Sequence, residues 1–167
     1  ILSYCDQNFI MLDKEIDMLQ VYLEIDQLRL SHEFTFDITV NEEIEPEEIP
    51  IPPMMLQPFV ENAIWHGLLP KSGEKKISIH FGLKGNDTLH CTVEDNGIGR
   101  KAAQKIREEK LMDKTVNRSK GMSLVNSRME ILEKKYGQTF SVNITDKQNA
   151  ESDGTGTIVE VFIPVVD

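Results

Sequence analysis

The sequence predicts an α+β fold: a two-layer α/β sandwich with a mainly antiparallel sheet, about three helices on one face, and a long N-terminal helix preceding them. Three observations predict it. Residues 12–30 repeat apolar side chains at helical spacing, and later segments alternate apolar and polar residues as strands do. Helical spacing returns between those strands, and the length of 167 residues suits one domain with a real core.

The long helix over residues 12–30 has two apolar rows on nearly opposite sides. One row is Leu12, Ile16, Leu19, Leu23 and Leu30, and the other is Met18, Val21, Ile25 and Leu28. A helix on the outside of a single core needs only one such row. We therefore expect this helix to pack on two partners, of which one can be another chain. The alternative is a helix central to its own domain.

A strand and a second helix are expected next. Residues 32–40 alternate as a strand does, and the acidic residues 41–48 are typical of a solvated connection. Prolines then exclude regular structure up to a helix that starts near Met54 and ends at Gly67. Pro58 falls in or just after the first turn of that helix, where a missing N–H costs least.

The rest of the chain is expected to hold strands and two helices. Residues 77–83 and 89–93 alternate, and the Gly-Asn-Asp run at 85–87 is typical of a hairpin turn. Further along we expect one short helix in a mobile segment within 100–117, a helix over 122–136, and strands over 140–144 and 157–165.

Composition narrows the classes of partner. The formal net charge is -10 and the pI about 4.9, which argues against nucleic acid or an anionic membrane surface as the main partner. Cys5 and Cys91 are too few for a disulfide framework or a zinc site. No apolar run approaches the roughly 18 residues that span a bilayer. The chain opens at Ile1 without an initiator Met, so we expect a fragment whose parent protein has further segments upstream.

The most informative motif is the run from Asp95 to Gly99, directly after a predicted strand. A strand end holds the Asp side chain rigidly, and glycines let the backbone approach a flat ligand closely. The carboxylate can accept a hydrogen bond from an exocyclic amine such as that of adenine. A plain turn is the alternative, because Asp-Asn-Gly is a common turn sequence.

Three further runs each have a ligand-binding interpretation and a purely structural one. Asn62 and His66 share a helix face, and an Asn carbonyl is a suitable oxygen ligand for Mg²⁺, but the same pattern fits an ordinary polar face. Gly121 opens a helix whose N-terminal N–H groups can receive phosphate, or it simply starts that helix. The Gly-Thr pair ending at Thr157 fits a pocket wall or a turn between strands.

The order of these four runs carries more information than any one of them. It resembles the asparagine box, two glycine boxes and terminal Gly-Thr motif of the superfamily that unites gyrase, Hsp90 chaperones, histidine kinases and mismatch-repair ATPases. The resemblance implies the Bergerat-type ATP-binding fold. Residues 56–67, Leu-Gln-Pro-Phe-Val-Glu-Asn-Ala-Ile-Trp-His-Gly, are similar to the LytS-type histidine kinases, and residues 22–30 resemble the segment that those kinases place between phosphoacceptor and catalytic domains.

The resemblance implies a role for each matching residue toward Mg-ATP. Asn62 would ligate Mg²⁺, Asp95 would receive the adenine amino group, and Thr157 would contact the adenine side of the pocket. Residues 100–120 would form a lid, and Glu61 is the candidate to orient or deprotonate the attacking histidine. The other expected nucleotide contacts are His66, Gly97, Gly99, Arg118, Lys120, Gly121, Met122, Ser123 and Leu124.

Three positions depart from the family pattern. Trp65 stands where many members have a Lys or Arg that meets phosphate, and Ser123 replaces the second Gly of the second glycine box. Pro58 lies four residues before Asn62, where hydrolysing members carry a catalytic Glu. This favours phosphoryl transfer to protein over ATP hydrolysis.

The implied function is the catalytic domain of a two-component sensor histidine kinase, with ATP and Mg²⁺ as cofactors. His32, His66, His80 and His90 all lack the Asn-Pro-His-Phe context of the phosphoacceptor, so we expect the acceptor helix upstream of Ile1. Residues 1–32 would end the dimerisation and phosphoacceptor region, and residues 33–167 would bind ATP.

The implied partners follow from that function. They are a response regulator receiver domain and a second copy of the intact protein, with no nucleic acid. The domain would be cytoplasmic, in a parent protein that meets the inner or plasma membrane only through missing N-terminal segments. The alternatives are a degenerate nucleotide-binding signalling module and an anti-sigma-type Ser kinase of the same fold.

Overall fold

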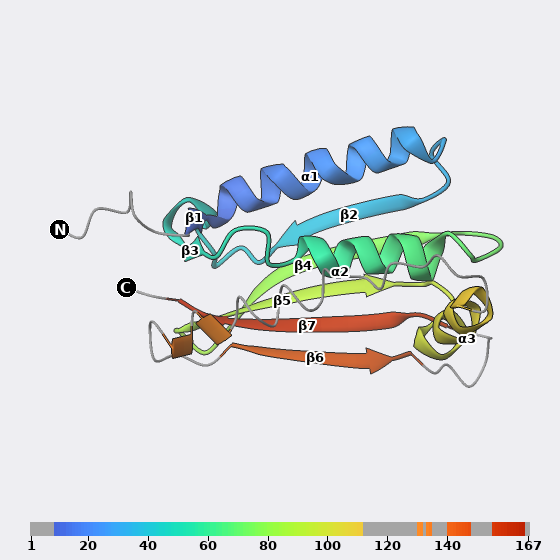
Figure 1. Ribbon diagram of the computed structural model, residues 1–167. Coiled ribbons are helices and arrows are strands. Elements are labelled where there is room, and N and C mark those ends of the chain that lie inside the picture. Colours follow the sequence, from blue (N-terminus) through green and yellow to red (C-terminus); the bar gives the residue numbers. More distant parts are fainter. Residues whose placement is uncertain (1–8, 112–129, 132, 135–139, 148–154, 166–167) are drawn as a thin grey trace.

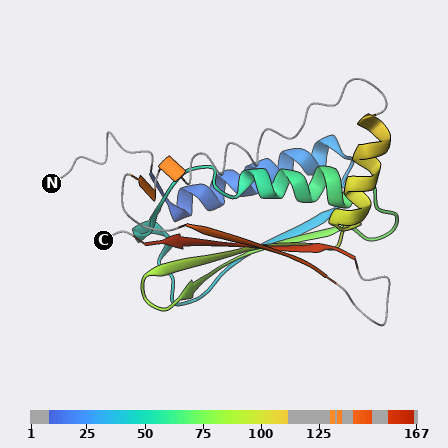
Figure 2. The same ribbon diagram turned by 60° about the horizontal axis from the view of Figure 1, so that its bottom comes forward.

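The computed structural model describes residues 9–111, 130–131, 133–134, 140–147 and 155–165. It has two layers, with the helices on one face of a five-stranded sheet (Figures 1 and 2). The sheet strands are β2 (Thr35–Val40), β4 (Lys76–Lys84), β5 (Thr88–Asp95), β6 (Ser141–Asp146) and β7 (Thr157–Pro164). The helices are α1 (Leu12–Arg29), α2 (Gln57–Asn62), which continues as the π-helix η3 (Ala63–Leu68), and α3 (Arg100–Leu111). The predicted α+β sandwich is confirmed.

The sheet order is β2-β4-β5-β7-β6. Only the β2–β4 pair is parallel among the described strands; β4–β5, β5–β7 and β6–β7 are antiparallel. The turn predicted at 85–87 joins β4 to β5, with Lys84 opposite Thr88 and Gly85 at a φ of 67°. A short ribbon of β1 (Ile10–Met11) and β3 (Pro50–Ile51) and the single-turn helix η2 (Pro46–Glu48) lie beside the start of α1.

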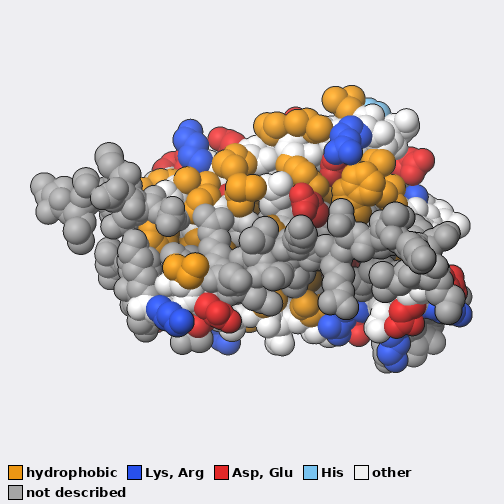
Figure 3. Space-filling view, in the orientation of Figure 1, with side chains coloured by type: hydrophobic (Ala, Val, Ile, Leu, Met, Phe, Trp, Pro, Cys, Tyr) orange, Lys and Arg blue, Asp and Glu red, His pale blue; other side chains and the backbone are white. Residues whose placement is uncertain are grey.

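The two apolar rows of α1 have different surroundings. Leu12, Leu19 and Leu23 of the first row are at most 2% exposed. The second row is exposed: Met18 45%, Val21 53%, Ile25 50% and Leu28 70%. Figure 3 shows apolar side chains along the upper edge of the molecule, where α1 lies. The first row therefore belongs to the core of this domain, and the second row contacts none of the described core.

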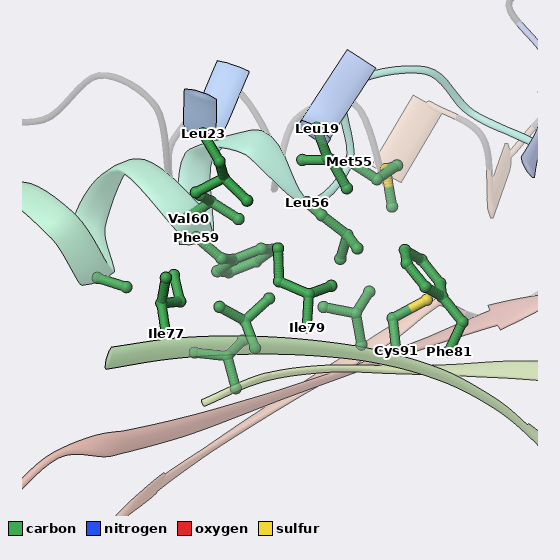
Figure 4. Close-up of a cluster of buried hydrophobic side chains, with 14 of the residues drawn as sticks. Leu19, Leu23, Met55, Leu56, Phe59, Val60, Ile77, Ile79, Phe81 and Cys91 are labelled. Carbon is green, nitrogen blue, oxygen red and sulfur yellow. The ribbon is translucent and has the colours of Figure 1, made fainter. Parts of the chain in front are cut away.

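One continuous core joins α1, α2 and the sheet. In Figure 4, Leu23 of α1 lies next to Val60 of α2, and Leu19 of α1 lies next to Met55 and Leu56. Phe59 of α2 lies near Ile77 of the sheet in the same view. Burying an apolar side chain of this size contributes about 1.5–3 kcal/mol. The helix formed by α2 and η3 is thus held between α1 and the sheet; we call it the pocket-bearing helix, because its residues line the cavity described below.

The predicted start of the second helix is wrong by three residues. Met54 has a φ of 61°, which lies outside the right-handed helical region, and α2 begins only at Gln57. The Met54 N–H donates to the Glu15 carboxylate of α1 at 3.1 Å, and Glu15 is 1% exposed. This long-range bond fixes a turn that the local sequence does not encode.

The described helices include none that is long and apolar enough to cross a membrane. The short helix expected within 100–117 is α3. Most of the helix expected over 122–136 lies outside the described residues, although Glu130, Ile131, Glu133 and Lys134 are helical.

Candidate nucleotide site

A cavity of about 220 Å³ lies between the pocket-bearing helix and the sheet, close to the start of α3. Its lining combines polar side chains with apolar walls: Phe59, Asn62, Ala63, His66, Gly67, Asp95, Gly99, Arg100, Ala103, Ile144, Thr157 and Val159. These residues come from α2, η3, α3, three strands and the loop between β5 and α3. Five of the residues predicted to contact nucleotide or metal, Asn62, His66, Asp95, Gly99 and Thr157, therefore share one cavity.

Asp95 ends β5 and is 4% exposed. Burial raises the pKa of its carboxyl from an ordinary 3.8 to about 6, although the Gly97 N–H, which donates to Oδ1 at 2.8 Å, favours the ionised form. At neutral pH the group is a desolvated carboxylate held by the backbone. Such a group is a strong, fixed acceptor for a ligand N–H.

Gly97 packs closely against the backbone of η3. A Cβ at Gly97 would lie 2.4 Å from the carbonyl carbon of Gly67 and 2.6 Å from its Cα, and the Ile98 N–H donates to the Gly67 carbonyl at 3.0 Å. The glycine run therefore packs backbone against backbone on η3. Gly97 packs against Gly67, which lines the cavity, but is not itself in the lining, whereas Gly99 is.

The pocket-bearing helix presents different residues to its two sides. Asn62 and His66 line the cavity, as their four-residue spacing predicts. Trp65 lies outside the cavity lining and packs on α1, where the Arg29 guanidinium lies 5.4 Å from its ring centre. Glu61 is also outside the lining, and its carboxylate accepts a 3.5 Å hydrogen bond from Gln57.

Thr157 reaches the cavity through sheet register. It begins β7 opposite Asp95 and also faces Asp146 of β6. The preceding Gly156 has a φ of 136°, and a Cβ there would lie 2.1 Å from the Asp95 carbonyl oxygen. The Gly-Thr run is thus shaped to fit against the end of β5.

An ion pair at the cavity rim has no counterpart among the predicted site residues. Arg100, the first residue of α3, donates from Nε to Asp146 Oδ1 at 2.8 Å and from a terminal nitrogen to Oδ2 at 3.0 Å. This bidentate bond joins the start of α3 to the end of β6 and holds the pKa of Asp146 below its usual range. Arg100 directly follows the glycine run, but its acidic partner is 46 residues away, so no local pattern pairs them.

Several predicted contacts lie outside the described residues: Arg118, Lys120, Gly121, Met122, Ser123 and Leu124. No group of three or more His, Cys, Asp or Glu side chains in the described part of the chain could hold a metal ion.

Comparison with known proteins agrees with this geometry. The sequence profile of the histidine kinase-, DNA gyrase B- and HSP90-like ATPase family matches residues 52–167. The chain is 29% identical to the sensor protein LytS of Oceanobacillus iheyensis over 98% of its own length and 26% of the relative's. It is 26% identical to the sensor histidine kinase YpdA of Escherichia coli K12, over 95% of this chain and 25% of that protein. The chain thus spans about a quarter of these two relatives.

Solved structures of low identity share the fold. The mycobacterial sensor histidine kinase MprB superposes with a TM-score of 0.62 at 14% identity, covering 94% of this chain and 96% of that one. A catalytic domain of the histidine kinase ThkA gives a TM-score of 0.59 at 14% identity, over 95% of this chain and 99% of that one. The fold, the shared cavity and the matching profile lead to one conclusion: the chain belongs to the histidine kinase-, DNA gyrase B- and HSP90-like ATPase family, and its relatives there include LytS sensor proteins.

Proposed function

We propose that this chain is the Mg-ATP-binding catalytic domain of a two-component sensor histidine kinase. The observation that carries the proposal is the meeting of Asn62, Asp95 and Thr157 in one cavity, although they lie on three separate segments of the chain. Membership of the family and the similarity to sensor proteins support the same function.

In this proposal the adenine end of the ligand is held by Asp95. Its carboxylate accepts the exocyclic amino group, and the Gly97 N–H keeps Oδ1 in place. Thr157 lies opposite Asp95 on β7 and is suited to bind the same end. The apolar walls, which include Phe59 and Val159, suit a flat aromatic base.

The phosphate end is assigned to Asn62 and its neighbours. The Asn62 carbonyl oxygen would hold Mg²⁺, which takes few protein ligands when phosphate oxygens complete its shell. The absence of a carboxylate or histidine cluster in the described part of the chain fits a metal that arrives with the nucleotide. His66, Arg118, Lys120 and the helix start at residues 121–124 would contact the phosphates, and residues 100–120 would cover them.

Bound ATP would supply a γ-phosphoryl group to a histidine of the parent protein outside this chain. Glu61 would orient or deprotonate that histidine, and its position outside the cavity lining suits a partner that approaches from another helix. An aspartate of a response regulator would then receive the phosphoryl group. Without a catalytic Glu at the Pro58 position, transfer to protein is favoured over hydrolysis.

We propose residues 1–32 as the end of the dimerisation and phosphoacceptor region and residues 33–167 as the ATP-binding unit. Leu12, Leu19 and Leu23 share the core of the second unit, so this helix would be fixed to it. The exposed row of α1 supports a homodimer of the intact protein. The domain would be cytoplasmic, in a parent anchored in the inner or plasma membrane.

Calorimetric titration with ATP, with and without Mg²⁺, tests the proposal. We expect Mg²⁺-dependent binding by the native chain, and Asn62→Ala to weaken it by about tenfold or more because a ligand of the metal is lost. Asn143→Ala removes an exposed amide on β6 and serves as the matched control. Metal-independent binding, or no binding, would exclude the kinase and favour a degenerate signalling module.

A further inference from the structure

Asn96 ties the end of β5 to the start of β4. Its side-chain carbonyl oxygen accepts a hydrogen bond from the Lys76 N–H at 2.7 Å, and its side-chain NH₂ group donates to the Glu74 carbonyl at 3.1 Å. Its backbone N–H donates to the Lys76 carbonyl at 3.1 Å. These hydrogen bonds join Asn96 to a stretch that lies 20 to 22 positions earlier in the chain.

The two side-chain bonds require an amide at position 96. An Asn side chain accepts through its oxygen and donates through its nitrogen, whereas an ionised Asp side chain can only accept. A carboxylate here would keep the bond from the Lys76 N–H, but it would face the Glu74 carbonyl with a second acceptor. The Asp-Asn-Gly run has the composition of an ordinary turn, yet its Asn side chain bonds to a distant strand.

Asp95 lies between two backbone anchors. On one side, the bonds of Asn96 hold the peptide that joins the two residues against β4. On the other side, the Gly97 N–H donates to Asp95 Oδ1 at 2.8 Å, and the Ile98 N–H donates to the Gly67 carbonyl at 3.0 Å. Asp95 lines the cavity, whereas Asn96 lies outside the lining. The direction of the Asp95 carboxylate therefore depends on bonds that its neighbour makes away from the cavity.

The direction of this carboxylate matters for recognition of a base. A hydrogen bond weakens steeply as its donor and acceptor lose alignment. Adenine presents an exocyclic amino group, whereas the base of inosine triphosphate (ITP) has a carbonyl oxygen at the same position. A site built to hydrogen-bond one ligand group rejects the analogue that lacks it. We infer that Asn96 is a positioning residue that aims the Asp95 carboxylate and so sets the preference of the cavity for adenine over a 6-oxo base, an inference that rests on the proposed role of Asp95 at the nucleotide.

The first test needs no ligand. Asn96→Ala removes both side-chain bonds and keeps the backbone bond, and hydrogen exchange of the Gly97 and Ile98 amides is measured in the 167-residue chain. Loss of the anchor predicts exchange about three- to tenfold faster at these two amides, with amides in the middle of β5 unchanged.

Asn41→Ala is the matched control. Asn41 also directly follows a strand, β2, and its backbone N–H donates to the Phe81 carbonyl of β4 at 2.9 Å. Its side-chain oxygen accepts a hydrogen bond from the Glu43 N–H at 3.1 Å. Asn41 is thus an asparagine of the same kind at a place that does not adjoin Asp95, and its replacement should leave exchange at residues 97 and 98 unchanged.

The second test separates positioning from stability by calorimetric titration with ATP and with ITP, each in the presence of Mg²⁺. The native chain should bind ATP about tenfold or more tightly than ITP. Asn96→Ala should lower this ratio about three- to tenfold, by weakening ATP binding and leaving ITP binding unchanged. Asn96→Asp should lower it as well, and the ratio cancels the added charge, which repels both nucleotides alike. Asn41→Ala should keep the native ratio.

The outcomes are distinct. Equal weakening of ATP and ITP binding by Asn96→Ala would show a purely structural role and overturn the inference, as would unchanged exchange at Gly97 and Ile98. If Asn96→Ala does not fold, Asn96→Asp carries both tests. If the native chain binds neither nucleotide, the proposed function fails, and the exchange of these two amides then decides whether Asn96 holds the end of β5 in place.

Discussion

Replacing Asp95 by Asn is expected to stabilise the folded chain while weakening nucleotide binding. Burial raises the carboxyl pKa from 3.8 to about 6, so the unfolded chain releases this proton at lower pH than the folded chain does. Stability contributed by this group is therefore lost as the pH rises from 3.8 to about 6 and stays lost above it. At 1.36 kcal/mol per pKa unit, ionising Asp95 costs the folded state about 3 kcal/mol at pH 7.5 and about half of that at pH 5.

The Asp95→Asn side chain would keep an acceptor oxygen for the Gly97 N–H, but its NH₂ group also needs a partner in a buried place. We expect a net gain in the free energy of unfolding of about 1–3 kcal/mol at pH 7.5, shrinking toward pH 5. ATP affinity should fall about tenfold or more, because a charged acceptor is lost.

Urea unfolding followed by circular dichroism at pH 5 and 7.5 measures the difference. Glu94→Gln is the matched control: it removes the neighbouring strand carboxylate, which pairs with Lys147 and is 45% exposed, and should change stability by less than about 1 kcal/mol. Equal stability of the Asp95→Asn variant and the native chain at pH 7.5 would refute the desolvation argument, as would a gain that does not shrink at pH 5.

Three further predictions concern the glycine run, the cavity rim and the two sides of α1. Gly97→Ala should destabilise the fold by about 1–3 kcal/mol or more because its Cβ meets the backbone of η3 at 2.4 Å, whereas Gly82→Ala, whose nearest neighbour is 3.6 Å away, should be tolerated. Arg100→Gln breaks a half-exposed ion pair and should cost less than about 1 kcal/mol, but it frees the start of α3 from β6, and stopped-flow measurement should show faster nucleotide release. Leu23→Ala should cost about 2–5 kcal/mol and Ile25→Ala less than about 0.5, as thermal unfolding can check, because only Leu23 is buried. Equal losses for Leu23 and Ile25 would contradict the two-sided description of α1.

The sequence predicted what depends on periodicity and on local turn chemistry. The buried row of α1, the hairpin at 85–87 and the shared face of Asn62 and His66 follow from spacing alone. Contacts between distant segments were missed, because no local sequence pattern predicts which residues far apart in the chain will meet. The left-handed turn at Met54, which bonds to Glu15, is one such contact.

The glycine run shows the same limit of sequence-based prediction at the site. Its composition indicated that something approaches the backbone closely, but the sequence suggested that this would be a ligand. The neighbour of Gly97 is the backbone of Gly67, another glycine in a different motif. The rim pair of Arg100 and Asp146 joins residues 46 positions apart and could be found only in three dimensions.

The pairing of Asp95 with Thr157 also has a consequence for folding. The β4–β5 hairpin can form early because its turn is local, but β5 meets β7 only after the long segment between them has closed. The part of the cavity that Asp95 and Thr157 line therefore does not exist in any partly folded state that lacks this non-local pairing. A nucleotide that needs both residues would select the fully folded chain and raise its melting temperature by mass action. Because such a ligand binds only after β5 has paired with β7, its binding reports whether this last, non-local strand pairing has formed.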